Sequence, residues 1–455
     1  MRTTSVDLKE LNDRELTESA ELNDMRALEE VRKQGAADNP ADAFAPPFPE
    51  KLEEIDVSPA FLADLVLKAV SMESDASTAN IAKRLHLGIL VTDALLHRVY
   101  QEKLIEKTGV VGLRNNRYGM LQHGWDKVKQ LISVNSYIGP APVSLKAYEE
   151  MIIGQVRSRP PVTPQAMQRA MINLVLPETM KLTLSLVASS GRSLFLTGPS
   201  GNGKTTMARA LVNAIPGDLW IPYALEMDGQ VIRLYDQHIH QQAEQTNGTH
   251  DPRWVRIRPP LVVVGGELTL NSMDLMSTDT QRFYEAPFQV KANGGVLVVD
   301  DLGRQRCSAK ELLNRWIVPL ENRVDYLTLN TGKKIQIPFE QTLLFATNLT
   351  DADLTDEAFL RRMGYRLHVP TPSPSTYAEI FIRYARAQGL FVDSDLLGRL
   401  LDRYSEEGRT PKCCDPRDLI DRVIDLHKFR NQTPILSAEV LDVAWANYFG
   451  GSTPA

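Results

Sequence analysis

Apolar residues recur at helical spacing through residues 58–135. This spacing predicts three helices, the first opened by a Ser-Pro pair and the third running from Val91 to Lys107. Arg117–Leu121 has the composition of a strand, and a short helix closes the segment. The pattern therefore predicts a small domain of helices with one strand-bearing extension.

The pattern changes after residue 163. A helical stretch opens the segment 164–374, and apolar runs typical of strands then alternate with helices. Such alternation predicts βαβ units, with a parallel sheet covered by helices on both faces. Residues 375–455 show helical spacing without a strand-like run. An α/β domain followed by a helical domain is therefore predicted.

Two further segments are expected to lie outside the folded domains. Residues 1–57 carry seven Lys/Arg against fifteen Asp/Glu and end in a Pro/Ala-rich stretch, and residues 136–163 contain a second proline-rich stretch. We predict a partly disordered acidic arm with a linker, and then a second linker. The domain at 58–135 would therefore fold on its own.

Composition narrows the class of protein. The chain has 455 residues, 43% hydrophobic and 24% charged, as in water-soluble globular proteins. No apolar run approaches the roughly 18 residues of a membrane span, and the N-terminus lacks the apolar core of a secretory signal. Cys307, Cys413 and Cys414 have neither disulfide-framework nor metal-site spacing. These features predict a cytoplasmic protein.

The strongest chemical signal is the glycine-rich segment GPSGNGKT, which begins at Gly198. It satisfies GxxxxGK[ST] between an apolar strand and a helix, which is the context that a phosphate-binding P-loop requires. Lys204 is expected to contact the β- and γ-phosphates of ATP, and the Thr205 hydroxyl to bind Mg²⁺. The residues predicted to hold the nucleotide are Gly198, Pro199, Ser200, Gly201, Asn202, Gly203, Lys204, Thr205 and Thr206.

A P-loop protein needs a second acidic site for its metal. Four apolar residues after Gly295 predict a buried strand, which ends in Asp300 and Asp301. Ligands of open α/β sheets lie at the carboxyl ends of the strands. We therefore expect Asp300 to hold Mg²⁺ and Asp301 to orient, or take a proton from, the attacking water.

These elements, in this order, resemble the Walker A and Walker B motifs of the AAA+ superfamily, and the resemblance covers roughly residues 165–450. Members typically carry Asp-Glu where this chain has Asp300 and Asp301, and the shorter Asp301 implies slow hydrolysis. The apolar strand that ends at Asn348 resembles the sensor-1 strand. The resemblance implies that Asn348 lies near the γ-phosphate and the attacking water.

Arginines further along resemble two other AAA+ elements. Arg361 or Arg362 matches the arginine finger, which would reach the γ-phosphate bound by a neighbouring subunit. Arg417, at a predicted helix start, resembles the sensor-2 arginine that contacts the bound nucleotide. The alternatives are a surface salt-bridge helix around Arg361 and Arg362, and pairing of Arg417 with Asp418 or Asp421.

Two apolar runs, Tyr326–Leu329 and Ile335–Ile337, predict a β-hairpin with Gly332 in its turn. It resembles the hairpin before sensor 1 in the AAA+ branch of MoxR-type ATPases. The long spacing between the Walker motifs is assigned to residues 222–260, where the polar stretch Gln237–Asp251 predicts a surface loop. His238 and His240 in that stretch lack the Cys or acidic partners of a metal site.

The resemblance implies an ATPase that works with Mg²⁺ as a homo-oligomeric, commonly hexameric, ring. Residues 58–135 resemble a winged-helix domain, but ten basic against seven acidic residues over 58–132 are weak for DNA binding. We therefore expect a remodeller of a protein partner that the N-terminal domain selects. The alternatives are a DNA-binding motor or regulator, and a scaffold that assembles with ATP and barely hydrolyses it.

Overall fold

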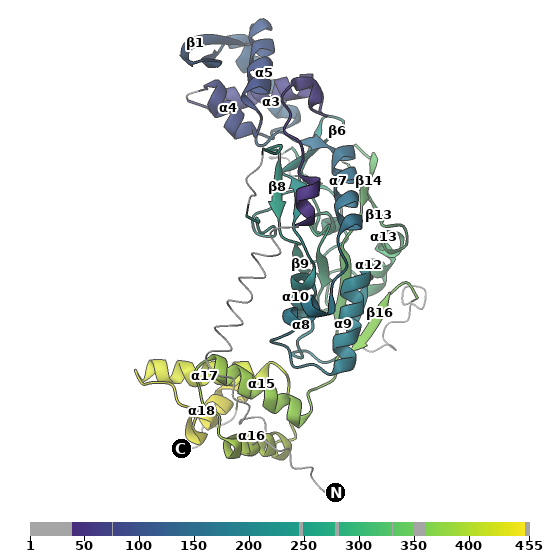
Figure 1. Cartoon of the computed structure of the whole chain (residues 1–455), viewed down its shortest axis with the longest axis vertical. Helices are drawn as coiled ribbons and strands as arrows, with labels where there is room; N and C mark the ends of the chain where they lie inside the picture. Colours follow the sequence, from purple (N-terminus) through teal and green to yellow (C-terminus); the bar gives the residue numbers. More distant parts are fainter. Residues whose placement is uncertain are drawn as a thin grey trace.

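The computed structural model describes residues 39–450, except 75, 245–248, 278–281, 330 and 350–360. Its parts follow one another along the long axis, with the N-terminal helices at one end and the C-terminal helices at the other (Figure 1). Most of the predicted acidic arm, residues 1–38, lies outside the described residues. So do the residues immediately before Arg361.

The N-terminal part contains α3 (Pro59–Met72), α4 (Thr78–Leu85), α5 (Ile89–Gln101), the hairpin β1 (Ile105–Gly112) and β2 (Asn115–Met120), and α6 (Gln122–Val134). The predicted third helix was too long, because α5 ends at Gln101 and Lys103 has a φ of 58°. Ile105 is buried and pairs with Met120, so tertiary burial places this segment in a strand.

The central sheet is parallel, with the order β16 (Tyr365–His368), β4 (Leu194–Thr197), β15 (Thr342–Thr347), β12 (Val296–Val299), β9 (Leu261–Val264). Alternate residues face opposite sides of a strand. On β4, Leu194 and Leu196 pack with helices α9 (Glu178–Ser190) and α10 (Lys204–Ala214), whereas Phe195 packs with the cluster that contains α12 (Ala309–Arg315). The predicted α/β class is therefore confirmed.

A second, β-rich part is formed mostly by residues between α10 and β12, and β3 joins it from before α10. It contains β5 (Leu219–Pro222) paired with β8 (Trp254–Ile257), and a mixed sheet with the order β10 (Met276–Ser277), β11 (Tyr284–Glu285), β7 (Gln230–Arg233), β6 (Ala224–Met227), β3 (Val143–Ser144). The predicted surface loop is wrong in part, because His240 is buried and its ring contacts the Lys291 carbonyl at 2.9 Å. The predicted hairpin is present as β13 (Val324–Thr328) and β14 (Lys334–Pro338).

Neither predicted linker is a linker where the structure describes it. Residues 136–163 contain α7 (Leu145–Ser158), which buries Tyr148 and Ile152 beside Trp220 of β5. The short turn η1 (Pro40–Phe44) also packs on the inserted β-rich part through Ala41, whereas η2 (Leu52–Glu54) places Leu52 against the core of the N-terminal part. We call residues 39–57 the strap. The Trp220 ring donates a hydrogen bond to its Ala41 carbonyl, at 2.9 Å.

The N-terminal part is not separate from the rest of the chain either. Ala224 and Val231 of the inserted sheet belong to its hydrophobic core, and the buried Lys68 ammonium donates to the carbonyls of Asn135 and Tyr137 at 2.9 and 2.8 Å. This part therefore packs against the insertion, and whether it folds on its own, as the sequence predicts, stays a prediction.

The C-terminal part contains only helices among its described residues: α15 (Pro374–Ala387), α16 (Ser394–Glu406), α17 (Asp415–Phe429) and α18 (Ala438–Phe449). They share a core of their own, which includes Tyr377, Tyr404 and Trp445. The predicted helical domain is confirmed. Among the described residues, no helix combines the length and apolar character needed to cross a bilayer.

Candidate nucleotide site

The glycine-rich segment joins the end of β4 to the start of α10. Gly198, Gly201 and Gly203 have φ values of 133°, 84° and 84°, a region that residues with a Cβ rarely adopt. A Cβ on Gly198 would stand 2.1 Å from the Val369 carbonyl oxygen, so glycine is also required sterically. The loop therefore turns tightly and leads into the N-terminus of α10, where free amides favour an anion.

Lys204 is the first residue of α10, and its ammonium lies inside the loop. It donates hydrogen bonds to the carbonyls of Gly198 and Pro199 at 2.7 and 3.0 Å, and to the Asn348 side-chain oxygen at 2.8 Å. Burial lowers the pKa of Lys204, while the carboxylates of Asp300 and Asp301 oppose that shift. The structure thus brings Lys204 together with Asn348 at the carboxyl ends of β4 and β15.

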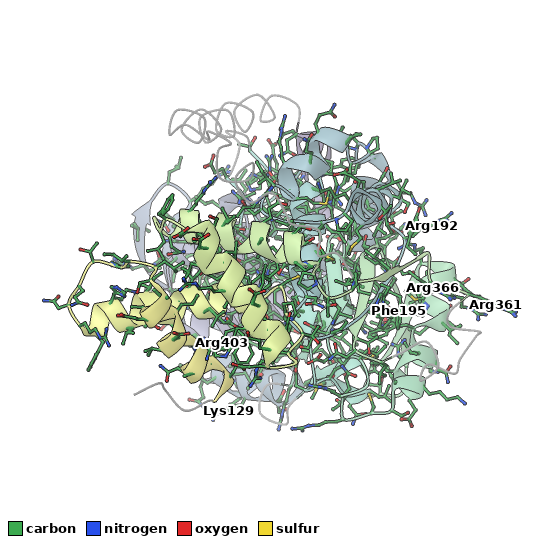
Figure 2. The ribbon with its side chains drawn as sticks, turned by 90° about the horizontal axis from the view of Figure 1, so that it is seen from below. Lys129, Arg192, Phe195, Arg361, Arg366 and Arg403 are labelled. Atoms are coloured by element: carbon green, nitrogen blue, oxygen red, sulfur yellow. The ribbon has the colours of Figure 1, made fainter. Side chains whose placement is uncertain are left out.

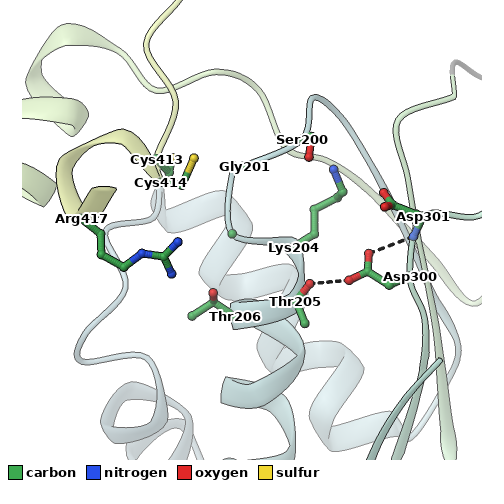
Figure 3. Close-up of a pocket in the computed structure, with 11 residues that line it drawn as sticks. Ser200, Gly201, Lys204, Thr205, Thr206, Asp300, Asp301, Cys413, Cys414 and Arg417 are labelled. Carbon is green, nitrogen blue, oxygen red and sulfur yellow. Dashed lines mark hydrogen bonds between the residues drawn. The ribbon is translucent and has the colours of Figure 1, made fainter. Parts of the chain in front are cut away.

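Thr205 and Asp300 face each other across the same edge of the sheet. The Thr205 hydroxyl donates to one Asp300 carboxylate oxygen at 2.7 Å, and the other oxygen accepts the Asp301 backbone amide at 2.9 Å (Figure 3). Hydroxyl and carboxylate oxygens are the hard ligands that Mg²⁺ takes in phosphate sites. This pair fits a magnesium ion held between protein and phosphate.

Asp301 follows β12 in a left-handed conformation, with a φ of 49°. A non-glycine residue in this region carries a local cost of about 1 kcal/mol or more, so its surroundings must hold it there. The Gln305 amide does so by donating to the carbonyls of Asp300 and Asp301, at 2.9 and 3.2 Å. No pattern in the sequence identified Gln305, because the contact depends on the turn between β12 and α12.

The C-terminal helices close the site from the other side. Arg417 and the neighbouring cysteines line a cavity of about 340 Å³ together with the P-loop (Figure 3). Burial raises the pKa of Cys413 to about 11, so its thiol faces the cavity in the neutral form. The lining residues are Ser200, Gly201, Gly203, Lys204, Thr205, Thr206, Asp300, Asp301, Cys413, Cys414 and Arg417.

Asn202 does not line this cavity; it joins the P-loop to the C-terminal helices. Its side chain is buried, donates to the Pro370 carbonyl at 3.2 Å and accepts the Cys413 amide at 3.3 Å. Asn202 is also one of the nucleotide-binding residues predicted from the sequence, and the structure gives its side chain this additional contact. Nothing in the sequence points to a partner 211 residues away.

Arg361 and Arg362 lie at the opposite end of the sheet from the P-loop. They precede β16, which runs parallel to β4, and Tyr365 is level with Leu194 at the start of that strand. Figure 2 shows Arg361 projecting at the edge of the molecule, beside Arg366 and away from the C-terminal helices. Arg362 forms an ion pair with Glu321. Within one chain, neither arginine is placed beside the nucleotide cavity.

Comparisons with known proteins concern the C-terminal helices and the general fold. Residues 373–447 match a family described as a domain of unknown function (DUF8689). No curated protein sequence matches the chain.

Two similar solved structures are NtrX from Brucella abortus in complex with ADP and the RuvB Holliday junction branch migration motor from Thermotoga maritima. Each is 16% identical, with TM-scores of 0.40 and 0.34, and each alignment covers 64% of this chain. The alignments cover 58% of the NtrX chain and 72% of the RuvB chain, so this chain matches little more than half of NtrX. At these values the similarity is limited to the fold.

Proposed function

We propose that this chain is an AAA+ ATPase that binds ATP with Mg²⁺ and hydrolyses it. The observation that carries the proposal is the convergence of Lys204, Thr205 and Asp300 on one cavity, beneath a loop whose glycines have positive φ. These are the groups that phosphoryl transfer requires: an anion cradle, a cation for the terminal phosphates and a metal site.

We assign a separate role in hydrolysis to each residue around the cavity. Thr205 and Asp300 would hold Mg²⁺, which would neutralise charge that develops on the phosphate oxygens. Asp301 would orient the attacking water and accept its proton, since its side chain remains 42% exposed at the cavity. Asn348, already within hydrogen-bond distance of Lys204, would fix the same water beside the γ-phosphate.

The position of the arginine pair favours a site shared between subunits. The four residues of β4 rise about 13 Å, at roughly 3.3 Å per residue, between the end beside Arg361 and the P-loop end. An arginine on the far edge cannot serve the nucleotide of its own chain, but it can face that of a neighbour. Ring assembly would supply such a neighbour, and Arg361 or Arg362 would then act as the finger.

The N-terminal part is the element that we assign to a protein partner. The tip of the β1–β2 hairpin exposes Val110, Val111 and Leu113, of which Leu113 is 97% accessible. Exposed aliphatic residues that gather on one hairpin favour contact with another apolar surface. The weak basic excess over 58–132 is small for a DNA-binding face. A protein-remodelling ATPase therefore remains the preferred function.

Two substitutions test binding and hydrolysis separately. Lys204→Ala should weaken ATP binding at least 100-fold in a calorimetric titration, because the phosphates lose their cation. Lys181→Ala on α9 is the matched control, since Lys181 is a surface lysine paired with Glu178. ATP affinity within threefold of wild type in a folded Lys204→Ala protein would overturn the P-loop assignment.

Asp301→Asn should retain Mg²⁺ and ATP but lower kcat by about 100-fold, the usual scale of general base catalysis. Asp301→Glu restores the acid that AAA+ proteins carry here and should keep or raise the rate. An unchanged kcat in Asp301→Asn would show that another group orients the water.

A further inference from the structure

Arg417 reaches the nucleotide cavity from the first turn of α17, and a neighbouring carboxylate holds it there. Its Nε and Nη2 atoms both donate to one oxygen of Asp418, at 3.1 and 3.0 Å. The Arg417 side chain is 59% exposed, so packing alone does not fix its direction. The orientation of the guanidinium therefore depends on the orientation of the Asp418 carboxylate.

The second Asp418 oxygen is held from the last turn of α18. The Tyr448 hydroxyl lies 3.2 Å from it and 2.9 Å from an oxygen of Asp415, the buried first residue of α17. Burial and the Asp415 carboxylate raise the pKa of Tyr448 far above neutrality, so the hydroxyl keeps its proton. One hydroxyl thus bridges the two carboxylates that flank Arg417 in sequence.

The Tyr448 ring is itself fixed against α17. The Arg422 guanidinium lies over the ring at 4.7 Å, and an Arg422 nitrogen donates to the Asp418 carbonyl at 2.6 Å. A cation over an aromatic face holds the ring in place as well as attracting it. The hydroxyl therefore has a defined position, and the contact continues through Asp418 to the cavity.

We propose that Tyr448 is a positioning residue for the nucleotide: through Asp418 it presets the Arg417 guanidinium towards the phosphates of ATP. This inference rests on the proposed function, since it assigns Arg417 to ATP. It adds the last described helix of the chain, α18, to the nucleotide site, although none of its residues lines the cavity. A ligand or partner that displaces α18 would then weaken ATP binding without touching the P-loop.

Tyr448→Phe tests the proposal because it removes one hydroxyl and keeps the ring. ATP affinity of the full-length protein should fall three- to tenfold in a calorimetric titration, the value expected for one hydrogen bond. The matched control is Tyr404→Phe. Tyr404 is buried in the same core and donates to the other Asp415 oxygen at 2.8 Å, so its hydroxyl holds Asp415 and not Asp418. Tyr404→Phe should keep wild-type ATP affinity.

A double-mutant cycle separates positioning from a general effect on the helices. If Tyr448 acts through Arg417, Tyr448→Phe should change ATP affinity little in an Arg417→Ala background. An equal loss in both backgrounds, or an equal loss from Tyr404→Phe, would overturn the proposal. Thermal melts identify a variant that fails to fold, and Asp418→Asn then serves as the second test, because it weakens the hold on Arg417 while Tyr448 stays in the core.

Failure of the proposed function gives a different result. If wild type binds no ATP, the site itself is misassigned and this inference falls with it. If wild type binds ATP and Arg417→Ala weakens that binding, but Tyr448→Phe matches wild type, only the positioning role is refuted.

Discussion

Asp56 of the strap, residues 39–57, is expected to stabilise the fold, although the sequence alone predicts a linker there. Arg253, with 5% of its side chain exposed, donates to both Asp251 oxygens and, through Nη1, to Asp56 of the strap at 3.1 Å. The same nitrogen reaches the Pro142 carbonyl at 3.2 Å. Substituting Asp56→Asn removes one of the charges that surround the buried Arg253, where three segments of the chain meet.

The expected loss in the free energy of unfolding depends on the partners that Arg253 keeps. Removing one partner of a fully buried pair costs about 3–5 kcal/mol, because an uncompensated charge is left behind. Here Asp251 stays bidentate, Asp56 is 30% exposed, and asparagine keeps an oxygen that can accept. We therefore expect Asp56→Asn to lower the free energy of unfolding by about 1–2 kcal/mol at pH 7.

The loss of stability caused by Asp56→Asn should become smaller as pH falls. Burial alone would raise the pKa of Asp56, but the hydrogen bond from Ser144 and the charge of Arg253 lower it below the usual 3.8. A carboxylate whose pKa is lower in the folded state stabilises the protein above the unfolded pKa and loses that contribution as pH falls. The difference between wild type and Asp56→Asn should therefore be full at pH 7 and shrink below about pH 4.

Urea unfolding followed by circular dichroism measures this difference. Glu53→Gln is the control, because it makes the same kind of change on an exposed side chain of the same strap. Equal midpoints for Asp56→Asn and Glu53→Gln at pH 7 would refute the reasoning about the Arg253–Asp56 pair. So would a difference that grows as pH falls.

Two further predictions concern the nucleotide site. Gly201→Ala should weaken ATP binding more than Gly203→Ala: both residues have a φ of 84°, but only a Cβ on Gly201 would meet another group, the Cys414 sulfur at 2.7 Å. Equal losses in calorimetric titrations would mean that the contact with the C-terminal helices is unimportant. Mixing Lys204→Ala subunits with Arg361→Ala/Arg362→Ala subunits should restore part of the ATPase rate, because some interfaces then pair an intact P-loop with intact arginines. A mixture that stays inactive although mixed oligomers form by native mass spectrometry would argue against a shared site.

Local patterns were sufficient for the centre of the molecule. Contiguous residues encode each of three elements: the P-loop, the strand before Asp300 and the strand before Asn348. The three strands are neighbours in one parallel sheet, so their carboxyl ends lie together. The sequence therefore predicted the α/β class and the parallel sheet, and it assigned both Lys204 and Asn348 to the surroundings of the γ-phosphate. The hairpin around Gly332 was found for the same reason, since a turn and its flanking strands are local.

The errors came from segments whose structure is decided by distant partners. Proline-rich stretches read as linkers because their few apolar residues have no local period, yet Ala41 and Tyr148 are buried against β5 and its neighbours. Arg256, almost fully buried, pairs with Asp42 of the strap and with Asp218. Such pairs are separated by up to 214 residues, and no window of sequence contains both members.

The contacts of β16 show how much of the site depends on such long-range packing. The strand has four residues. Arg361 and Arg362 precede its first residue. The Val369 and Pro370 carbonyls follow its last residue, where they contact Gly198 and Asn202 of the P-loop. Beyond Pro370 the chain enters the C-terminal helices, of which α17 carries Arg417. In the proposed ring, a neighbouring subunit that contacted Arg361 or Arg362 would therefore lie one short strand away from the groups that touch the P-loop.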